Sequence, residues 1–369
     1  EFGIADNLIT TSENIFARQR TSYEINENHI LNLAISPTYT SRKADDLLID
    51  GPFDPALAQG TLFDLVTGLE YKLELFNKRL QNIAFFKNYR QNVRIESEDP
   101  SLDETQIEKR AVNNFGAGNG IRYNWSERFS TKLSYEYAIR LPRQDEIFGD
   151  GQLVTENLGL RPENSHNLNI TFTYGSKAYA RSNWQVQTNF FVRQIDDLIL
   201  LLVDANEFGS FRNVWSATST GVEFSGNVKN LLKGLTISAN ATYQDYRNTS
   251  DVGPFIRFRD DRIPNLPYLF TNGSGEYQFK NIINNEDSLS LFWNVRYVNS
   301  FFVGWESAGL EQFKAVVPDQ TIHAVGLTYR LATTKLQNSL TIEVQNLTDA
   351  KVFDFFGVQR PGRAVFLKL

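Results

Sequence analysis

The sequence predicts an all-β protein, and more specifically a transmembrane antiparallel β-barrel. Apolar and polar residues alternate with a period of two along much of the chain, which is typical of strands with two different faces. About fifteen such segments occur, many of roughly ten residues or more, which is the length that a tilted strand needs to cross a bilayer. Short connections alternate with mostly longer ones, as they do in outer-membrane barrels.

The alternation can be followed along the chain. The first expected strand lies near residues 13–25. Later strands repeat the pattern; in the clearest of them, Leu291 and Trp293 share one face while Ser290 and Asn294 share the other. We expect further strands at Phe115–Tyr123, Thr131–Ile139, Leu168–Tyr174, Leu235–Gln244, Ser288–Val298, Leu340–Gln345 and Ala364–Leu369.

The connections assign a direction to each strand. We expect short links at 26–29, 77–79, 126–129, 175–182, 231–234, 281–287 and 333–337. We expect the longer loops at 43–60, 98–110, 142–164, 204–211, 248–266, 300–320 and 349–362. Since outer-membrane barrels have short periplasmic turns and long extracellular loops, the first and the last strand both run from the extracellular rim towards the periplasm.

In such a barrel the apolar side chains face lipid, whereas Arg, Glu, Asn and Thr line a water-filled or plugged lumen. The alternative is a soluble β-sandwich or propeller, whose apolar faces pack together. Strand length and turn asymmetry favour the barrel. The composition, with 41% hydrophobic and 22% charged residues, fits either fold. A net charge of −6 argues against a nucleic-acid partner.

Four stretches of the chain resemble the C-terminal part of TonB-dependent outer-membrane receptors, particularly those of Bacteroidetes-type bacteria. The first is "AIRLPRQDEIFGDGQLVTENLGLRPENSHNLNITF", from Ala138 to Phe172. The others are "NVWSATSTGVEFSGNV", "DDRIPNLPYLFTNGSGEYQF" and "NLTDAKVFDFFGVQRPGRAVFLKL", and all four follow the order of the family. One departure is Leu369, where the family usually ends in Phe or another aromatic residue.

The resemblance implies a 22-stranded barrel with an N-terminal plug domain and a segment that contacts TonB. About fifteen strands would be the last part of such a barrel, and an odd number is not expected to close alone. We therefore expect residues 1–369 to be the C-terminal portion of the barrel, with the plug and the first strands upstream or on another chain. The expected location is the outer membrane of a Gram-negative bacterium, with lipid and lipopolysaccharide around the barrel.

The residues give little reason to expect catalysis, a metal or a cofactor. His29, His166 and His323 are scattered without paired spacing, and there is no Cys. Adjacent acids such as Asp196 and Asp197 have no nucleophile or oxyanion donor near them in the sequence. We therefore expect a protein that is not an enzyme.

The "GAGNG" segment lacks the Lys and the strand-to-helix context of a phosphate-binding loop. When it is interpreted as a strand, its glycines and the next polar residue face the lumen: Gly116, Gly118, Gly120 and Arg122. Three missing side chains leave room for another backbone. One hypothesis is that the plug packs there; the other is a bend in the barrel wall.

The long loops are the expected place of ligand contact. The loop at 248–266 carries guanidinium groups, which suit an anionic ligand such as a ferric chelate, and the loop at 300–320 carries aromatic rings, which could stack on a sugar or an aromatic chelator. The candidate ligand-binding residues are Arg257, Arg259, Arg262, Phe301, Phe302 and Trp305. Alternatively, the arginines pair with Asp251, Asp260 and Asp261 or with lipopolysaccharide phosphates, and the aromatics belong to the interfacial girdle.

The function that follows is that of a TonB-dependent receptor, which imports a scarce nutrient such as an iron chelate, cobalamin or an oligosaccharide. On the mechanism of that family, the extracellular loops capture the ligand and TonB pulls on the plug. The alternatives are a passive porin-like channel, which needs no plug, and a soluble β-rich binding protein or enzyme, which would not need detergent.

Overall fold

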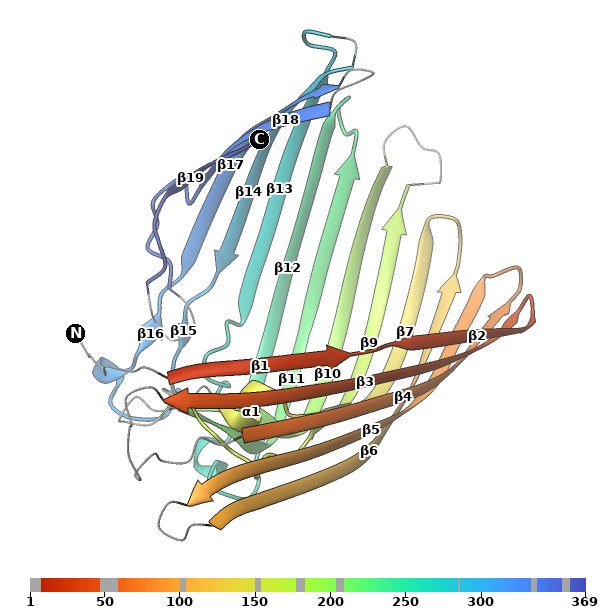
Figure 1. Ribbon diagram of the computed structural model, residues 1–369. Coiled ribbons are helices and arrows are strands. Elements are labelled where there is room, and N and C mark those ends of the chain that lie inside the picture. Colours follow the sequence, from red (N-terminus) through yellow and green to blue (C-terminus); the bar gives the residue numbers. More distant parts are fainter. Residues whose placement is uncertain are drawn as a thin grey trace. The chain divides into compact units, whose positions relative to one another are not determined.

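The computed structural model describes residues 8–46, 59–99, 104–149, 154–176, 183–203, 209–284, 286–332, 337–353 and 359–369. Apart from three short helices, the described chain is built of strands and their connections (Figure 1). None of those helices is long and apolar enough to cross a membrane. The chain divides into two compact units, the first made of Glu1–Ile121, Ser134–Asn167 and Gln194–Ser216, and the second of Arg122–Leu133, Leu168–Arg193 and Ala217–Leu369.

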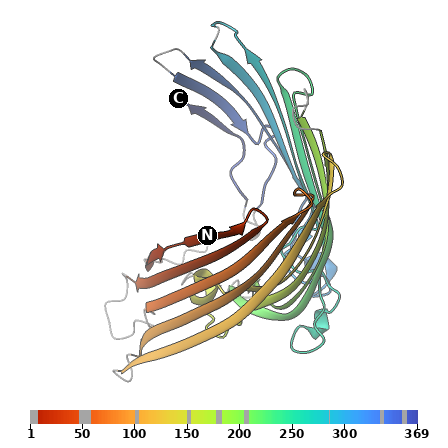
Figure 2. The ribbon, with the colours of Figure 1, turned by 90° about the vertical axis from the view of Figure 1, so that its right-hand side faces the viewer.

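The first unit begins with five strand segments, which are β1 (Leu8–Phe16), β2 (Gln19–Asn26), β3 (His29–Asp46), β4 (Gln59–Leu75) and β5 (Leu80–Asp99). It also contains α1 (Gln144–Phe148) and β8 (Val154–Thr155). Strands that contribute residues to both units are β6 (Glu104–Asn124), β7 (Phe129–Arg140), β9 (Glu163–Gly175), β10 (Asn183–Val203) and β11 (Gly209–Lys229). In Figures 1 and 2, β3, β4 and β5 run side by side, and their antiparallel pairing is continuous.

The second unit contains β12 (Leu235–Asn248), β13 (Leu269–Lys280), β14 (Ser288–Val298), β17 (Gln320–Ala332), β18 (Gln337–Gln345) and β19 (Ala364–Lys368). Its long connections hold η1 (Ile256–Phe258), β15 (Phe301–Phe302), η2 (Glu311–Phe313) and β16 (Val316–Val317). The six strands named first pair in chain order, each antiparallel to the next.

The structure confirms the approximate number of strands and, apart from the first, the strands that the sequence predicts. Both β1 and β2 pair with β3, so they form one interrupted strand. With these two counted as one, and without the two-residue strands β8, β15 and β16, the described residues contain fifteen strands. The longest of them, β6, β10 and β11, have 21 residues each. Such lengths exceed the roughly 9–11 residues that a bilayer crossing requires.

The first expected strand, near 13–25, is not continuous as predicted. It breaks at Ala17 and Arg18, between β1 and β2. Pro37 of β3 stands opposite this break, and the N–H of Ala17 donates to the carbonyl of Pro37 at 3.1 Å. Since proline has no N–H, it cannot complete the ladder on this side. The cause of the interruption therefore lies in β3 and not in the strand that is interrupted.

Two of the expected long loops are shorter than predicted. The one at 98–110 overlaps β5, which extends to Asp99, and β6, which starts at Glu104; the one at 204–211 overlaps β11, which starts at Gly209. These strand ends could not be recognised in the sequence, because the alternation of apolar and polar residues disappears where both faces carry polar groups, as at Lys109 and Arg110. Residues 47–58, 100–103, 150–153, 177–182, 204–208, 333–336 and 354–358, which fall in expected connections, lie outside the described residues.

In the second unit the two faces of the sheet differ as predicted. Leu291 and Trp293 lie on one face and remain more than 40% exposed, as an apolar surface that meets lipid would. On the other face Ser238 and Ser274 are hydrogen-bonded at 2.6 Å, and Asn272 donates to Asn240 at 2.9 Å. We call these the apolar face and the polar face.

In the first unit the predicted polar lining does not hold throughout. Leu69 and Phe86 form a cross-strand pair on the exposed apolar face. On the opposite face of the same strands, Leu62, Val93 and Ile95 are 4% exposed and form a core with residues from beyond β7. The buried partners from the other segments are Ile147, Leu160 and Ile199. On these strands, the face that was predicted to line a water-filled or plugged lumen is therefore covered by packed hydrophobic side chains.

The loop between β7 and β9 folds onto this cluster through ion pairs. Arg140 donates from Nη1 to both carboxylate oxygens of Glu146 at 2.8 Å, and from Nε and Nη2 to Glu163 at 2.7 and 2.6 Å. Glu146 also accepts the backbone N–H of Arg143 at 2.8 Å, which caps α1. Phe148 packs so closely over Gly60 that any side chain at that position would overlap its ring. Residues 141–148 are therefore held against the sheet.

The turn between β13 and β14 is organised by one carboxylate. Asp287, which is 2% exposed, accepts backbone N–H groups from Ile282, Ile283 and Asn284 at 2.6, 2.7 and 3.1 Å. The hydroxyl of Tyr329 donates to the same carboxylate at 2.8 Å. Burial on its own would raise the pKa of Asp287, but these hydrogen bonds favour the ionised form and hold the pKa below its ordinary value.

Candidate functional site

Two long connections of the second unit come together in the structure. One joins β12 to β13 (residues 249–268) and the other joins β14 to β17 (residues 299–319). The N–H of Asn265 donates to the carbonyl of Phe302 at 2.9 Å. Ser307 donates from its backbone N–H and its hydroxyl to Asp261 at 3.0 and 2.6 Å. The two loops that the sequence singled out therefore form one structure, which we call the two-loop site.

Trp305 is the main apolar contact of the two-loop site. It is 8% exposed, and its ring stacks on Phe258 with centroids 4.9 Å apart and planes at 3°. Phe255 packs against the same indole at 6.0 Å. Asn248, fully buried at the end of β12, donates to the carbonyl of Phe255 at 2.8 Å and fixes that side of the loop. Because Trp305 is buried between the loops, its role in the structure is to hold them together.

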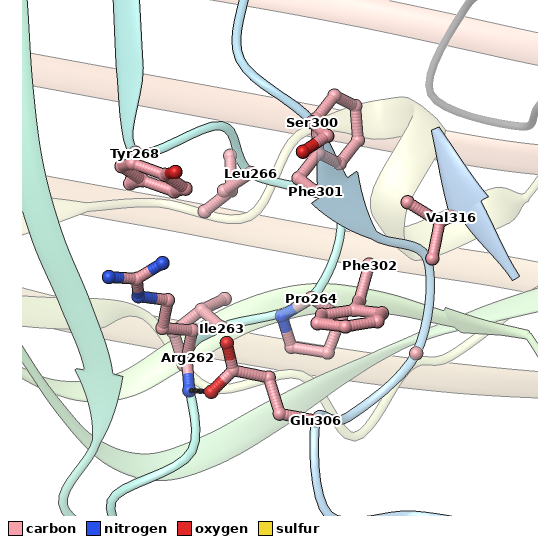
Figure 3. A pocket seen from close by; sticks show the side chains of 11 residues that line it. Arg262, Ile263, Pro264, Leu266, Tyr268, Ser300, Phe301, Phe302, Glu306 and Val316 are labelled. Carbon is pink, nitrogen blue, oxygen red and sulfur yellow. Dashed lines mark hydrogen bonds between the residues drawn. The ribbon is translucent and has the colours of Figure 1, made fainter. Parts of the chain in front are cut away.

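A pocket of about 240 Å³ lies in the two-loop site (Figure 3). It is lined by Arg262, Ile263, Pro264, Leu266, Tyr268, Ser300, Phe301, Phe302, Gly304, Glu306 and Val316. Figure 3 shows the guanidinium of Arg262 pointing towards Tyr268, and the carboxylate of Glu306 beside the backbone nitrogen of Arg262. Three of the predicted ligand-binding residues, Arg262, Phe301 and Phe302, thus line one pocket.

The charge of the pocket is mixed. The guanidinium of Arg262 lies over the ring of Tyr268 at 4.2 Å, and its Nε is 3.5 Å from a carboxylate oxygen of Asp245. Its backbone N–H donates to Glu306 at 3.2 Å. Asp245 also accepts two hydrogen bonds from Arg247, at 3.0 and 2.8 Å. An anionic group that binds Arg262 would therefore compete with Asp245.

The other predicted residues of this site lie outside the pocket lining. Arg257 is exposed and stacks over Phe258 at 4.6 Å. Arg259 forms an ion pair with Asp251, which is the alternative to ligand binding that the sequence analysis left open for this residue. Sequence reasoning missed Tyr268 and Glu306. Tyr268 follows the "RIPNLP" motif, but nothing in the sequence links it to Glu306, because their proximity depends on how the loops fold.

The predicted plug-facing residues lie elsewhere. In the first unit, a side chain at Gly116 would approach the carbonyl of Tyr137 at 2.8 Å and the ring of Tyr89 at 3.2 Å. At Gly118 it would meet the ring of Phe85 at 2.5 Å. The glycines therefore make room for aromatic side chains of β5, and a plug packed here would contact those rings. Plug packing stays a prediction.

The remaining two of these residues have polar partners. The carbonyl of Gly120 accepts a hydrogen bond from Asn82 at 3.3 Å. In the second unit, Arg122 is exposed and donates to the hydroxyl of Ser130 at 3.3 Å. Among the described residues, no group of three or more His, Cys, Asp and Glu side chains is placed to hold a metal ion.

Residues 79–347 match the family model described as TonB dependent receptor-like, beta-barrel. The chain belongs to the TonB-dependent receptor family. Its fold is accordingly the antiparallel β-barrel of these receptors, as the sequence predicts. The narrower likeness to Bacteroidetes-type receptors stays a prediction. No protein of curated function matches the sequence.

Solved structures of TonB-dependent receptors share this fold. The copper transporter OprC matches with a TM-score of 0.72 at 16% identity, covering 98% of this chain and 56% of its own. The siderophore receptor PiuA from Acinetobacter baumannii matches with 0.71 at 14% identity, covering 98% and 56%. The ferric-catecholate import receptor Fiu from Escherichia coli K12 matches with 0.70 at 12%, covering 97% and 54%. This chain thus spans a little over half of each receptor. Members of the family are outer-membrane transporters of Gram-negative bacteria.

Proposed function

We propose that residues 1–369 are the C-terminal barrel portion of a TonB-dependent receptor that imports a scarce nutrient across the outer membrane. The family match supports the transporter class, and the coverage of a little over half of the similar receptors supports a portion that works with a plug and further strands. The partners in this proposal are the plug, TonB, the nutrient ligand and the surrounding lipid.

The observation that carries the proposal is the two-loop site. Trp305 fixes both loops against one another, so the pocket exists before a ligand arrives. Preformed sites bind without the cost of ordering their loops. Loops held on a rigid strand scaffold are also the usual location of recognition.

The size and lining of the pocket suggest a ligand class. About 240 Å³ is smaller than the roughly 300–1,000 Å³ of pockets that enclose drug-sized ligands, so the pocket would hold one ring-sized group of a larger molecule. Phe302 and Tyr268 offer aromatic surface, and Arg262 and Glu306 offer a hydrogen-bond donor and an acceptor. A phenolic or catechol ring of an iron chelate meets all of these. PiuA is described as a siderophore receptor and Fiu as a ferric-catecholate import receptor.

The test is binding and uptake of ⁵⁵Fe-labelled ferric catechol chelates by cells that produce the complete receptor. We expect Arg262→Gln and Phe302→Ala each to weaken binding about tenfold, the worth of one hydrogen bond to a charged group or one aromatic contact. The matched control is Phe313→Ala, because Phe313 belongs to the same loop but is 78% exposed and outside the pocket lining. If the control and the pocket variants lose binding equally, this pocket is not the site.

Energy coupling separates the proposal from a passive porin-like channel. Uptake through a TonB-dependent receptor should stop when the proton-motive force is dissipated or tonB is deleted, while ligand binding at the cell surface continues. Uptake that persists under both treatments would establish the passive channel instead. Extraction into buffer without detergent would contradict both membrane proposals.

A further inference from the structure

We infer that Asp64, Gln91 and Gln144 form a binding site for a calcium ion under the loop between β7 and β9. All three residues belong to the first unit, with Asp64 in β4, Gln91 in β5 and Gln144 in α1. Each carries a buried oxygen atom without a hydrogen-bond partner in the described part of the chain, namely Oδ1 of Asp64 and Oε1 of the two glutamines. The inference concerns how the loop is held and does not depend on the proposed function.

The strand register places Asp64 and Gln91 side by side. They stand directly opposite each other in the ladder of β4 and β5, where Cβ atoms are about 4.5–5.5 Å apart. The next pair on the same face is Leu62 and Val93, which belong to the buried core cluster. Gln91 itself is 1% exposed. The two oxygen atoms therefore lie on the covered face of the sheet, beside apolar side chains that offer no hydrogen bond.

The orientation of the Gln91 amide is fixed by its nitrogen. Nε2 donates to the carbonyl of Pro142 at 2.8 Å. A carbonyl only accepts hydrogen bonds, so the nitrogen has to face Pro142 and the oxygen has to point away from it. The same contact ties the loop to the sheet at this place. Gln144, two residues after Pro142, adds the third unpaired oxygen from the loop.

The site offers acceptors but no donor. Thr38 of β3 and Gln91 of β5 flank Asp64 on the neighbouring strands, and neither donates to its Oδ1. Leaving a buried acceptor unpaired is unfavourable, and more so when the acceptor is charged. A single water molecule donates two hydrogen bonds and cannot serve three acceptors. One cation coordinated by all three oxygens satisfies them together and neutralises the carboxylate.

The type of oxygen atom points to calcium. Ca²⁺ accepts carboxylate and amide oxygens in flexible geometry, whereas Mg²⁺ demands a nearly ideal octahedron and keeps most of its water. Zn²⁺ prefers nitrogen and sulfur ligands, which this site lacks. Only Asp64 is acidic, and two of the three ligands are neutral amides. With so little charge we expect weak binding, with a dissociation constant of about 1 mM, as in extracellular calcium modules.

A cation at this place would join β4 and β5 to the loop. It would bind the closed loop and not the open one, so calcium should lower the population of the open loop by the factor 1 + [Ca²⁺]/Kd. At about 10 mM Ca²⁺ and a Kd of about 1 mM this factor is about ten.

The test is amide hydrogen exchange of residues 143–149 in the complete receptor in detergent, stripped with EDTA and then measured with and without about 10 mM CaCl₂. Exchange in the parent should slow about tenfold with calcium. Asp64→Asn keeps the shape of the side chain and brings an N–H that can donate to Oε1 of Gln91, so its exchange should not respond to calcium. The matched control is Asp145→Asn, which removes the same charge from an exposed carboxylate of the same loop and should keep the tenfold response.

Three results overturn the inference. If calcium leaves exchange in the parent unchanged, the three oxygens are hydrated by buried water only. If Asp64→Asn responds to calcium as the parent does, the carboxylate is not a ligand. If MgCl₂ protects the parent as well as CaCl₂ does, the effect is general screening by divalent ions.

Folding and transport are checked separately. Heat-modifiable gel migration should be the same for the parent and both variants. Should Asp64→Asn not fold, Gln144→Ala serves as the test, because it removes one ligand; a fivefold weaker Kd would reduce the calcium response to about threefold. A calcium response in a chain that fails to take up ⁵⁵Fe chelates would contradict only the proposed function. Uptake without a calcium response would contradict only the cation site.

Discussion

Replacing Glu146 by alanine should release the loop between β7 and β9 from the sheet. Glu146 is 3% exposed and accepts two hydrogen bonds from Arg140 and one from the backbone of Arg143, all at 2.8 Å. The substitution removes the ion pair and the cap of α1 together. Ile147, which is fully buried in the core cluster, is the next residue, so loosening the cap also loosens the apolar contacts.

The free-energy cost of this substitution depends on the hydrogen bonds that Arg140 keeps. Breaking a buried ion pair costs roughly 3–5 kcal/mol when the partner is left alone. Here only Glu146 is buried; the Arg140 side chain is 38% exposed and keeps its two hydrogen bonds to Glu163, so we expect at most the lower end of that range, about 3 kcal/mol. This corresponds to about a 100-fold rise in the population in which the loop is open.

The assay is amide hydrogen exchange of residues 143–149 in the complete receptor in detergent, since exchange reports local opening. Exchange in Glu146→Ala should be about 100-fold faster than in the parent. The matched control is Asp145→Ala, whose carboxylate is 57% exposed and pairs with Arg143 on the surface. Surface pairs contribute about 0–1 kcal/mol, so the control should change exchange less than about fivefold. Equal acceleration in both variants would refute the reasoning.

Three further predictions concern the second unit. Gly221→Ala should prevent correct assembly, because the new methyl group would overlap the Tyr243 carbonyl and the Phe191 ring. Gly275→Ala should assemble normally, since the nearest neighbour of its new methyl group is 4.0 Å away. Heat-modifiable gel migration checks both variants. Trp305→Ala should cost about 3 kcal/mol and expose both loops to protease, which Phe313→Ala should not do. Asp287→Asn should lower Tm by a few degrees at pH 7. The lowered pKa of Asp287 stabilises the fold above its unfolded pKa of about 3.9, and this stabilisation is lost as the pH falls through the folded pKa. The difference in Tm between the parent and the variant should therefore vanish in acid.

The strand architecture could be predicted from sequence because a period of two is a local signal. In β14 the residues from Ser288 to Val298 alternate, and the structure places them in one strand. The break between β1 and β2 could not be found in this way. Its cause is Pro37, which lies in the neighbouring strand, so it required knowledge of which strands pair.

The candidate site could be predicted only in part for the same reason. Clusters of Arg and aromatic residues marked the two loops, and the structure joins them through Asn265, Phe302 and Trp305. Whether an arginine is available to a ligand depends on its folded neighbours. Arg259 pairs with Asp251 near it in sequence, whereas Arg262 shares Asp245 of β12 and lies over Tyr268 of the connection to β13.

Alternation states which residues share a face, but it does not state what that face meets. Leu62 and Leu69 both look like lipid-facing residues in the sequence, although they lie on opposite faces of β4. Leu69 is 47% exposed, and Leu62 is covered by the loop between β7 and β9. That loop can be apolar where it packs because Arg140 and Arg143 neutralise Glu146 and Glu163 beside it. Because residues 141–148 are held against the sheet, the proposed function assigns ligand capture to the two-loop site.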